Sequence, residues 1–163
     1  MAKPKKNRVV LKPPSVLFYK PQGVPLAQLR RVVLEVDEYE AIRLVDKEGL
    51  QQNEAAERMD ISRATCARIL ESAHRKIGEA LTGGMAIEIA GGSFTFTNNR
   101  YRCADCGMLW ELPADEPTPD QGLACPACKS SRFTDLGAAI GPGRMMRGRG
   151  GYHRYGGGRR GAG

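Results

Sequence analysis

Two pairs of cysteines constrain the fold of this chain more than any other feature of its sequence. Cys103 with Cys106 and Cys125 with Cys128 each follow the pattern C-x2-C, with 18 residues between the pairs. Each pair can wrap a tight turn that presents two thiolates, and two such turns complete the tetrahedron that a structural Zn²⁺ ion prefers. Because four sulfur ligands leave no open coordination position, we expect the ion to build the fold and not to activate water.

The sequence leaves a second metal open, since an iron centre held by four thiolates uses the same ligands. We expect zinc in preference to iron. A redox role is disfavoured because the two pairs lack the strand–helix context of redox C-x2-C motifs. Residues 101–136 are therefore predicted to form a zinc ribbon. Gly107 fits the positive-φ residue of the first turn, and Trp110, Leu112 and Phe133 are expected to form a minimal core.

A second motif consists of two helical segments, residues 51–59 and 62–81, separated only by Asp60 and Ile61. Two helices joined by so short a turn, the second basic on one face, are typical of a helix-turn-helix. Ser62 is placed to cap the second helix. Cys66 lies in the apolar stripe of that helix and is expected to pack as an inert thiol. Asp60 stands where such turns often need a positive φ, which Asp tolerates better than most residues.

The outer face of the second predicted helix begins with basic residues. A helix in the major groove contacts base edges with its N-terminal turns, and arginine suits the guanine edge. Arg63 and Arg68 are the candidates for such contacts, and either residue 64 or 65 is a candidate for a thymine methyl group. Residues further along are expected to contact phosphates. The expected DNA-contacting residues of this helix are Arg63, Ala64, Thr65, Arg68, Arg75 and Lys76. The alternative is an ordinary helical hairpin with a solvated basic face.

Positive charge gathers at both ends of the chain. The net charge of +7 divides into +5 over the first twelve residues, +6 over the last 23, and −4 between them. An acidic body with basic ends suits a polyanionic partner, whereas the plainer alternative is two tails that only aid solubility. We expect the N-terminal basic residues to follow the DNA backbone or an adjacent minor groove. These residues are Lys3, Lys5, Lys6 and Arg8.

The rest of the chain divides by composition into an arm, a connector and a tail. We expect a Pro-containing arm over residues 1–24, a helical domain over 25–84, a β-hairpin connector over 85–100 and a disordered Gly/Arg-rich tail over 137–163. Apolar spacing predicts a helix over 25–36. Asp37 is expected to cap the next helix, with Glu38 and Glu40 on its solvated face. The predicted fold class is mainly α, with a helix-turn-helix domain followed by the small β ribbon and the tail.

Several classes of protein are not expected from this sequence. No run of about 18 apolar residues is present, so no membrane span is expected. The N-terminus lacks the apolar segment of a secretory signal, and the cysteines are then expected to remain thiols or metal thiolates in the cytoplasm. The two histidines, His74 and His153, lie near no obvious nucleophile in the sequence. We therefore expect no enzyme.

With these motifs in hand, the chain resembles a known prokaryotic family. The segments YKPQGVPL, VDEYEAIRLVDKEGL, NEAAERMDISRATCARILESAHRKIGEAL and IEIAGG are similar to the family catalogued as domain of unknown function 134. The resemblance covers about residues 1–92. It implies a helix-turn-helix similar to the fourth region of sigma factors, with Ser62 to Thr65 and Arg68 facing DNA. Family members usually carry Ser where Gln51 stands and Gly where Asp60 stands, so local stability at these two positions is in question.

The sequence favours one function and leaves two others open. We expect sequence-specific binding of double-stranded DNA by a transcriptional regulator with a structural zinc ribbon. The first alternative is an RNA-binding accessory protein that uses the ribbon and the Gly/Arg tail. The second is a protein that handles a metallocofactor. RNA or a protein of the transcription machinery are further expected partners of the ribbon, and the oligomeric state, a homodimer included, is left open.

Overall fold

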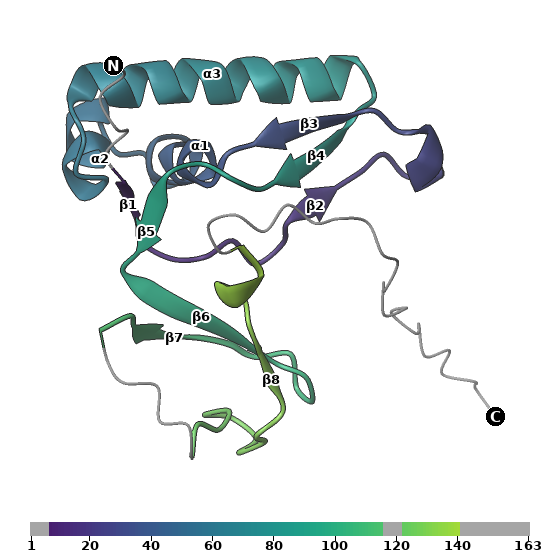
Figure 1. Cartoon of the computed structure of the whole chain (residues 1–163), viewed down its shortest axis with the longest axis vertical. Coiled ribbons are helices and arrows are strands. Elements are labelled where there is room, and N and C mark those ends of the chain that lie inside the picture. Colours follow the sequence, from purple (N-terminus) through teal and green to yellow (C-terminus); the bar gives the residue numbers. More distant parts are fainter. Residues whose placement is uncertain (1–6, 116–121, 141–163) are drawn as a thin grey trace, which may run out of the picture.

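The computed structural model describes residues 7–115 and 122–140 (Figure 1). In these residues the chain forms three α-helices and eight strands in three sheets, so the fold is mixed α/β and the prediction of a mainly α protein is wrong. The helices are α1 (Val36–Ile42), α2 (Gln52–Arg58) and α3 (Arg63–Thr82), with a π-helical turn at Arg43–Lys47 and 3-10 turns at Leu26–Gln28 and Ala138–Ile140. The strands are β1 (Arg8–Val10), β2 (Phe18–Tyr19), β3 (Arg31–Leu34), β4 (Ala86–Ile89), β5 (Phe94–Phe96), β6 (Asn98–Cys103), β7 (Leu109–Pro113) and β8 (Phe133–Asp135).

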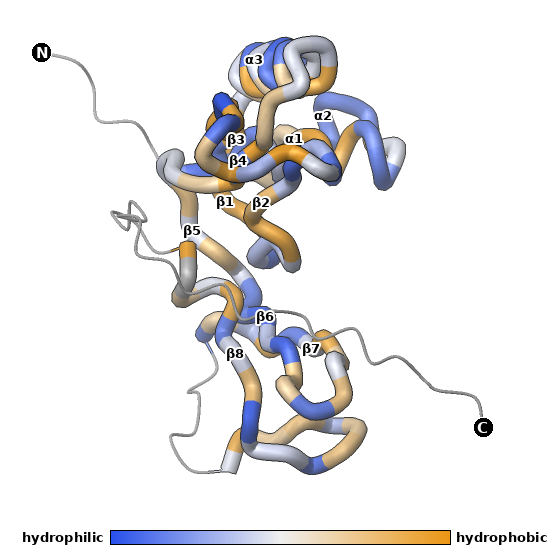
Figure 2. The backbone as a smooth tube through the Cα atoms, turned by 90° about the vertical axis from the view of Figure 1, so that its right-hand side faces the viewer, coloured by the Kyte–Doolittle hydropathy of each residue, from blue (hydrophilic) through white to orange (hydrophobic). Residues whose placement is uncertain are grey.

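The described residues form a helical body and a ribbon. In the body, β4 pairs parallel with β3 and antiparallel with β2, while β1 pairs parallel with β5. In the ribbon, β6 pairs antiparallel with both β7 and β8. Figure 2 shows the body at one end of the molecule and the ribbon at the other, with β5 between them. No helix in the described part of the chain is long and apolar enough to cross a membrane.

The helix predicted over residues 25–36 is wrong, because this segment contains a 3-10 turn followed by β3. The apolar residues have helical spacing, but Val32 and Val33 are β-branched and favour an extended backbone. Pairing with β4, in which Val32 lies opposite Ile87, provides backbone partners from a segment more than 50 residues away. Local periodicity was therefore overridden by a distant strand.

The hairpin predicted over residues 85–100 is also wrong, since β4 and β5 belong to different sheets. Gly91 and Gly92 both have positive φ, of 71° and 94°. The Gly91 carbonyl accepts the Val36 amide at 3.2 Å, and a Cβ on Gly92 would lie 2.7 Å from Asp37 Oδ1. The two glycines therefore let the backbone pass close to the start of α1, which a hairpin turn would not require.

The predicted helix-turn-helix segments are confirmed as α2 and α3. The Ser62 hydroxyl accepts the Thr65 amide at 3.2 Å, so Ser62 is the predicted N-cap. Asp60 has the expected positive φ, 52°, and Cys66 is fully buried as predicted. Gln51 also caps α2 through a reciprocal pair of hydrogen bonds with Glu54, so Gln replaces Ser there without loss of the cap. The inner faces of both helices meet in one apolar cluster: Ala41, Leu44, Ala55, Ala56, Met59, Cys66, Ile69 and Leu70.

The acidic residues at the start of α1 are buried, which corrects the prediction of a solvated face. The helix begins one residue early, at Val36, and its cap is Glu35 and not Asp37. Asp37, Glu38 and Glu40 are no more than 4% exposed. Cations from segments far away in the sequence or one turn along the helix reach these carboxylates, so local amphipathicity did not predict their burial.

Candidate functional site

The four predicted metal ligands come together at the tip of the ribbon. Their sulfur atoms all lie within 4.8 Å of one another. The Cys103 and Cys128 sulfurs are 3.6 Å apart, as are those of Cys106 and Cys125. Four sulfurs about 2.3 Å from one ion at the corners of a tetrahedron lie about 3.8 Å apart. The donor set therefore fits a single tetrahedral metal ion.

Each C-x2-C pair wraps a turn of the same kind. The Gly107 amide donates to the Cys103 carbonyl at 3.2 Å, and the Lys129 amide donates to the Cys125 carbonyl at 2.9 Å. The residue that follows each pair has positive φ, 74° at Gly107 and 62° at Lys129. The prediction for Gly107 is confirmed. Lys129 was missed, although its position directly after Cys128 matches that of Gly107 after its own pair.

Hydrogen bonds around the cysteines favour the thiolate at one position. Backbone donors at Cys106 and Asp105 lower the pKa of Cys103 to about 7. The Asp105 amide lies 3.4 Å from the Cys103 sulfur. The Ser130 amide works to lower the pKa of Cys128, but the neighbouring Cys103 thiol and burial raise it to about 12. The thiolate is the form of cysteine that binds a metal.

A small aromatic cluster supports the metal turns. The rings of Tyr101, Trp110 and Phe133 are mutually in contact, with centroids 5.5–5.6 Å apart. Leu112 packs against the same cluster, so the predicted core of the ribbon is confirmed. Tyr101 also belongs to this core and was not predicted. The alternation of side chains along a strand could have indicated it, because Tyr101 precedes the buried Cys103 by two residues on β6 and so shares its face.

The outer face of α3 carries most of the predicted DNA-contacting residues. Arg63, Ala64, Arg68 and Arg75 are exposed, and Ser62 is exposed at the cap. Ala64, Arg68 and Arg75 lie at spacings of four and seven residues, which places them on one stripe of the helix. Glu71 is exposed on the same stripe. Ala64, Arg68 and Arg75 therefore lie together on one face, whereas Arg63 lies about 140° around the helix from Arg68.

The arginines of α3 differ from those elsewhere in the fold. Seven arginines bind a carboxylate or a backbone carbonyl through their side chains: Arg8, Arg31, Arg43, Arg58, Arg100, Arg102 and Arg132. Within the described ranges, Arg30, Arg63, Arg68 and Arg75 have no such side-chain partner. Three of these four lie on α3, so this helix presents guanidinium groups that the fold itself does not use.

Three predicted contact residues have partners within the fold. The Thr65 hydroxyl lies 2.8 Å from the Ser62 hydroxyl in the cap. Lys76 Nζ donates to Glu38 at 2.7 Å, and Arg8 forms an ion pair with buried Asp37. Burial raises the pKa of Asp37, and the Arg8 charge opposes this shift. Arg8 and Lys76 therefore stabilise the fold through ion pairs with buried carboxylates. Lys3, Lys5 and Lys6 lie outside the described residues.

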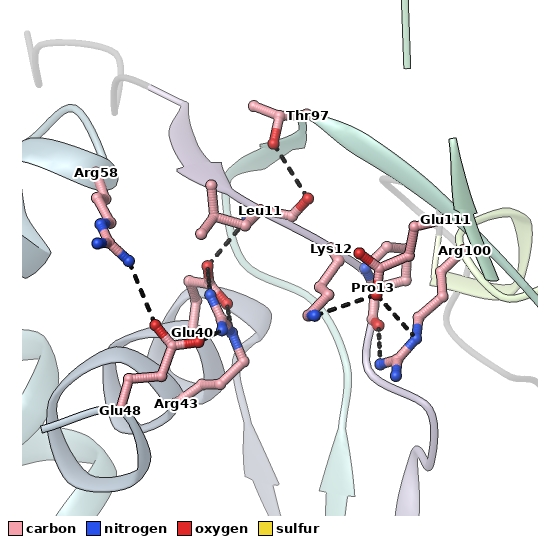
Figure 3. A network of polar contacts seen from close by, with 10 residues as sticks. All are labelled: Leu11, Lys12, Pro13, Glu40, Arg43, Glu48, Arg58, Thr97, Arg100 and Glu111. Atoms are coloured by element: carbon pink, nitrogen blue, oxygen red, sulfur yellow. Dashed lines mark hydrogen bonds and ion pairs between the residues drawn. The ribbon is translucent and has the colours of Figure 1, made fainter. Parts of the chain in front are cut away.

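A buried ionic network was missed in the sequence (Figure 3). Glu40, fully buried, accepts the Leu11 amide at 3.0 Å and two nitrogens of Arg43 at 2.8 Å each. Arg43 also contacts Glu48, which Arg58 reaches at 3.3 Å. The hydrogen bonds to Glu40 raise the pKa of Arg43, so the guanidinium stays charged. The i,i+3 spacing of Glu40 and Arg43 could have predicted that they pair, but nothing in the sequence predicted that the pair is buried.

These features define a small α/β protein that combines a helix-turn-helix with a four-cysteine ribbon. The chain belongs to the family described as "Protein of unknown function DUF134", whose profile matches residues 1–97. A "UPF0251 protein" of Moorella thermoacetica is 46% identical over 145 residues, 88% of this chain and 87% of the relative. Another from Desulforudis audaxviator is 44% identical over 128 residues, 78% of this chain and 82% of the relative.

The similarity to relatives extends past the family profile. A "UPF0251 protein" of Desulfosudis oleivorans is 42% identical over 132 residues, 79% of this chain and 94% of the relative. An alignment of 145 residues, as with the Moorella relative, must continue beyond residue 97 into the ribbon. The ribbon is therefore part of what these relatives share with this chain. No solved structure matches the chain.

Proposed function

We propose that this protein binds double-stranded DNA in a sequence-specific way through α3 and acts as a transcriptional regulator. The observation that carries this proposal is the group of arginines on the outer face of α3 that have no side-chain partner in the described fold. Exposed guanidinium groups on a helix held by a packed inner face suit the edge of guanine and the phosphate backbone.

The spacing on α3 assigns roles along the groove. The seven residues from Arg68 to Arg75 correspond to about 10 Å along a helix, similar to the width of the major groove. Arg63 and Arg68, nearer the N-terminus, are assigned to base edges, and Arg75 to a phosphate. Glu71 between them is a candidate to accept a hydrogen bond from a cytosine amino group.

The N-terminal basic residues fit the same interface. The Val9 amide donates to the Met59 carbonyl at 3.0 Å, so the chain enters the described fold beside the helix-turn-helix turn. Lys3, Lys5 and Lys6 precede this point by only a few residues. We assign them to the DNA backbone near the start of α3.

We assign a structural zinc ion to the four cysteines. Four thiolates in a closed tetrahedron suit zinc and leave no position for a substrate. The fully buried Cys66 thiol and the metal thiolates are compatible with the reducing cytoplasm, where we place the protein.

The test is selection of bound duplexes from a random DNA library by purified, metal-loaded full-length protein. We expect a defined motif to be enriched, with affinity that falls steeply as salt rises. Parallel measurement with structured RNA at the same salt separates the proposal from the alternative of an RNA-binding accessory protein. Equal affinity for every duplex, or a preference for RNA, would contradict sequence-specific DNA binding.

A further inference from the structure

Residues 8–15 touch both the helix-turn-helix and the ribbon, and we call them the connecting segment. On the helical side, the Val9 amide donates to the carbonyl of Met59 in the turn before α3, at 3.0 Å. The Leu11 amide donates to the buried carboxylate of Glu40 at 3.0 Å. The Leu11 side chain also packs against the apolar cluster of α2 and α3. The segment is therefore part of the wall of the helix-turn-helix.

On the ribbon side, the same segment is held by residues of β6 and β7. Arg100 donates to the Pro13 carbonyl at 3.3 Å, and Arg102 donates to the Ser15 carbonyl at 2.9 Å. Lys12 pairs with Glu111 at 3.1 Å. Pro13 is among the fully buried residues of the fold. Figure 3 shows the two sets of contacts close together, with Leu11 and Glu40 on one side and Arg100 and Glu111 on the other.

The ribbon begins and ends against the body. At its start, the Thr97 and Asn98 amides donate to the Val10 and Leu11 carbonyls at 3.1 and 3.0 Å. At its end, Ile140 is only 6% exposed and packs in the second apolar cluster of the body, which includes Val10. A change in the fold of the ribbon therefore acts on the body at more than one point of the connecting segment.

We infer that metal occupancy of the four cysteines raises the affinity of α3 for DNA, and that the connecting segment transmits this effect. The inference rests on the proposed function and names its regulation. The effector is the metal ion, and it binds at the four cysteines. Its binding controls the position of the turn at Met59 and of the point where the N-terminal segment enters the described fold.

The coupling has a direct physical basis. The ribbon has a small core and depends on its metal for stability. Without the ion, the strands that carry Arg100, Arg102 and Glu111 lose their positions, so the ribbon no longer holds residues 12–15. The contacts of residues 8–11 with the body, which include the β1–β5 pairing and the Val9 and Leu11 amides, then hold only the N-terminal half of the connecting segment. The body itself retains its own apolar cluster, so its helices stay folded while the segment beside the turn loosens.

The first experiment compares DNA affinity of the metal-loaded and the chelator-stripped full-length protein, using the motif from the selection. We expect the loaded form to bind about 5- to 150-fold more tightly, the usual range of coupling between two sites. Thermodynamic reciprocity requires DNA to raise the Zn²⁺ affinity by the same factor. Equal DNA affinity of the two forms would refute the inference. So would loss of the helical circular-dichroism signal on stripping, because that would mean global unfolding.

The second experiment cuts the contacts of the ribbon with the connecting segment. The double variant Arg100→Ala/Arg102→Ala keeps all four cysteines and all of α3, so it should bind Zn²⁺ with the same stoichiometry but lose most of the coupling. Arg132→Ala is the matched control, because this ribbon arginine pairs with Asp105 inside the ribbon. The control should keep the coupling of the wild type. A double variant that folds, binds Zn²⁺ and retains full coupling would overturn the assigned route.

A readout without DNA separates this inference from the proposed function. Hydrogen exchange of the Val9 and Leu11 amides should accelerate on removal of the metal in the wild type and in Arg132→Ala. If that acceleration occurs but no duplex binds, the connecting segment transmits the metal state and the DNA-binding proposal fails. If duplexes bind and exchange at both amides is independent of the metal, the coupling fails and DNA binding stands.

Discussion

The helical body and the ribbon are stabilised in different ways. The body buries two apolar clusters and in addition pairs its buried carboxylates with cations, such as Glu40 with Arg43. The ribbon buries a single cluster that includes two of its own metal ligands, Cys103 and Cys125. A core of that size does not usually hold a fold without a metal or disulfides. One half therefore depends on packing, and the other carries a small core beside a four-cysteine site that fits a metal ion.

A second contrast, between α3 and the rest of the fold, separates the arginines by role. In the body and the ribbon, arginines such as Arg43 and Arg102 bind carboxylates or carbonyls and hold segments together. On α3, Arg63 and Arg68 have no such partner within the described residues. The difference teaches that a positive charge in the sequence is a poor indicator of a DNA contact until its internal partners are known.

The largest expected effect tests the dependence of the ribbon on its metal. Chelation, or Cys125→Ser, should abolish the folded signal of Trp110, the single tryptophan of the chain, while the helical circular-dichroism signal remains. The reason is that Trp110 packs only within the ribbon cluster, whereas the long helices belong to the body. The matched control Cys66→Ser changes the buried cysteine of the body and should leave Zn²⁺ stoichiometry unchanged. Simultaneous loss of both signals on chelation would show that the body depends on the metal as much as the ribbon does.

A second prediction tests the body. Glu40→Ala leaves the Arg43 guanidinium, 8% exposed, without its main partner, and should lower the free energy of unfolding by about 3–5 kcal/mol. Arg58→Ala at the exposed end of the same network is the control and should cost less than about 1 kcal/mol. Urea unfolding followed by circular dichroism measures both. A Glu40→Ala effect no larger than the control would show that this network does not stabilise the body.

A third prediction concerns the unpartnered arginines. Arg68→Ala should weaken binding to the selected duplex by about 1–3 kcal/mol with no change in stability, because it removes a base contact and no internal bond. Arg30→Ala is the control, since Arg30 is also exposed and without a side-chain partner in the described ranges but lies outside α3. Fluorescence anisotropy at fixed salt gives both affinities. Equal losses in the two variants would mean a diffuse electrostatic effect.

The smallest expected effects come from Asp60 and Lys129, the two non-glycine residues with positive φ in residues 7–115 and 122–140. Lys129→Gly should raise the free energy of unfolding of the ribbon, followed by the Trp110 signal, by about 1 kcal/mol. The reason is that glycine adopts the left-handed backbone conformation without strain. Asp60→Gly in the body should stabilise by less, since Asp tolerates this conformation better than Lys. DNA preference should be unchanged by Asp60→Gly. Urea midpoints from the two signals measure the gains, and a loss at either position would mean that the native side chain contributes more than its backbone strain costs.

Sequence reasoning was most successful where the signal is local. The C-x2-C pairs and Gly107 could be assigned because five consecutive residues, from the first cysteine to the residue after the second, determine the geometry of each turn. The cap at Ser62 and the buried position of Cys66 followed from helical periodicity in the same way. In each case the residues that decide the structure are close together in the chain.

Sequence reasoning failed where partners are distant. The segment that forms β3 has a helical apolar pattern, and only its pairing with β4 makes it a strand. Asp37 and Glu40 have the pattern of a solvated helix start. Arg8 and the Leu11 amide, each 29 residues away in the sequence, bind these buried carboxylates, and Arg43 also binds Glu40. No local pattern contains this information, because the pairing residues are about 30 or more positions apart.

By itself, then, the sequence determined the four-cysteine site and the helix-turn-helix, since short-range spacing and capping dictate both. The tertiary structure alone decided which charged residues are structural and which are available, since each choice depends on a partner brought near by folding. It also decided that residues 8–15 join the two halves. An extended segment with two prolines has no local preference for either neighbour, and only the amides, carbonyls and side chains that surround it in the fold determine its position.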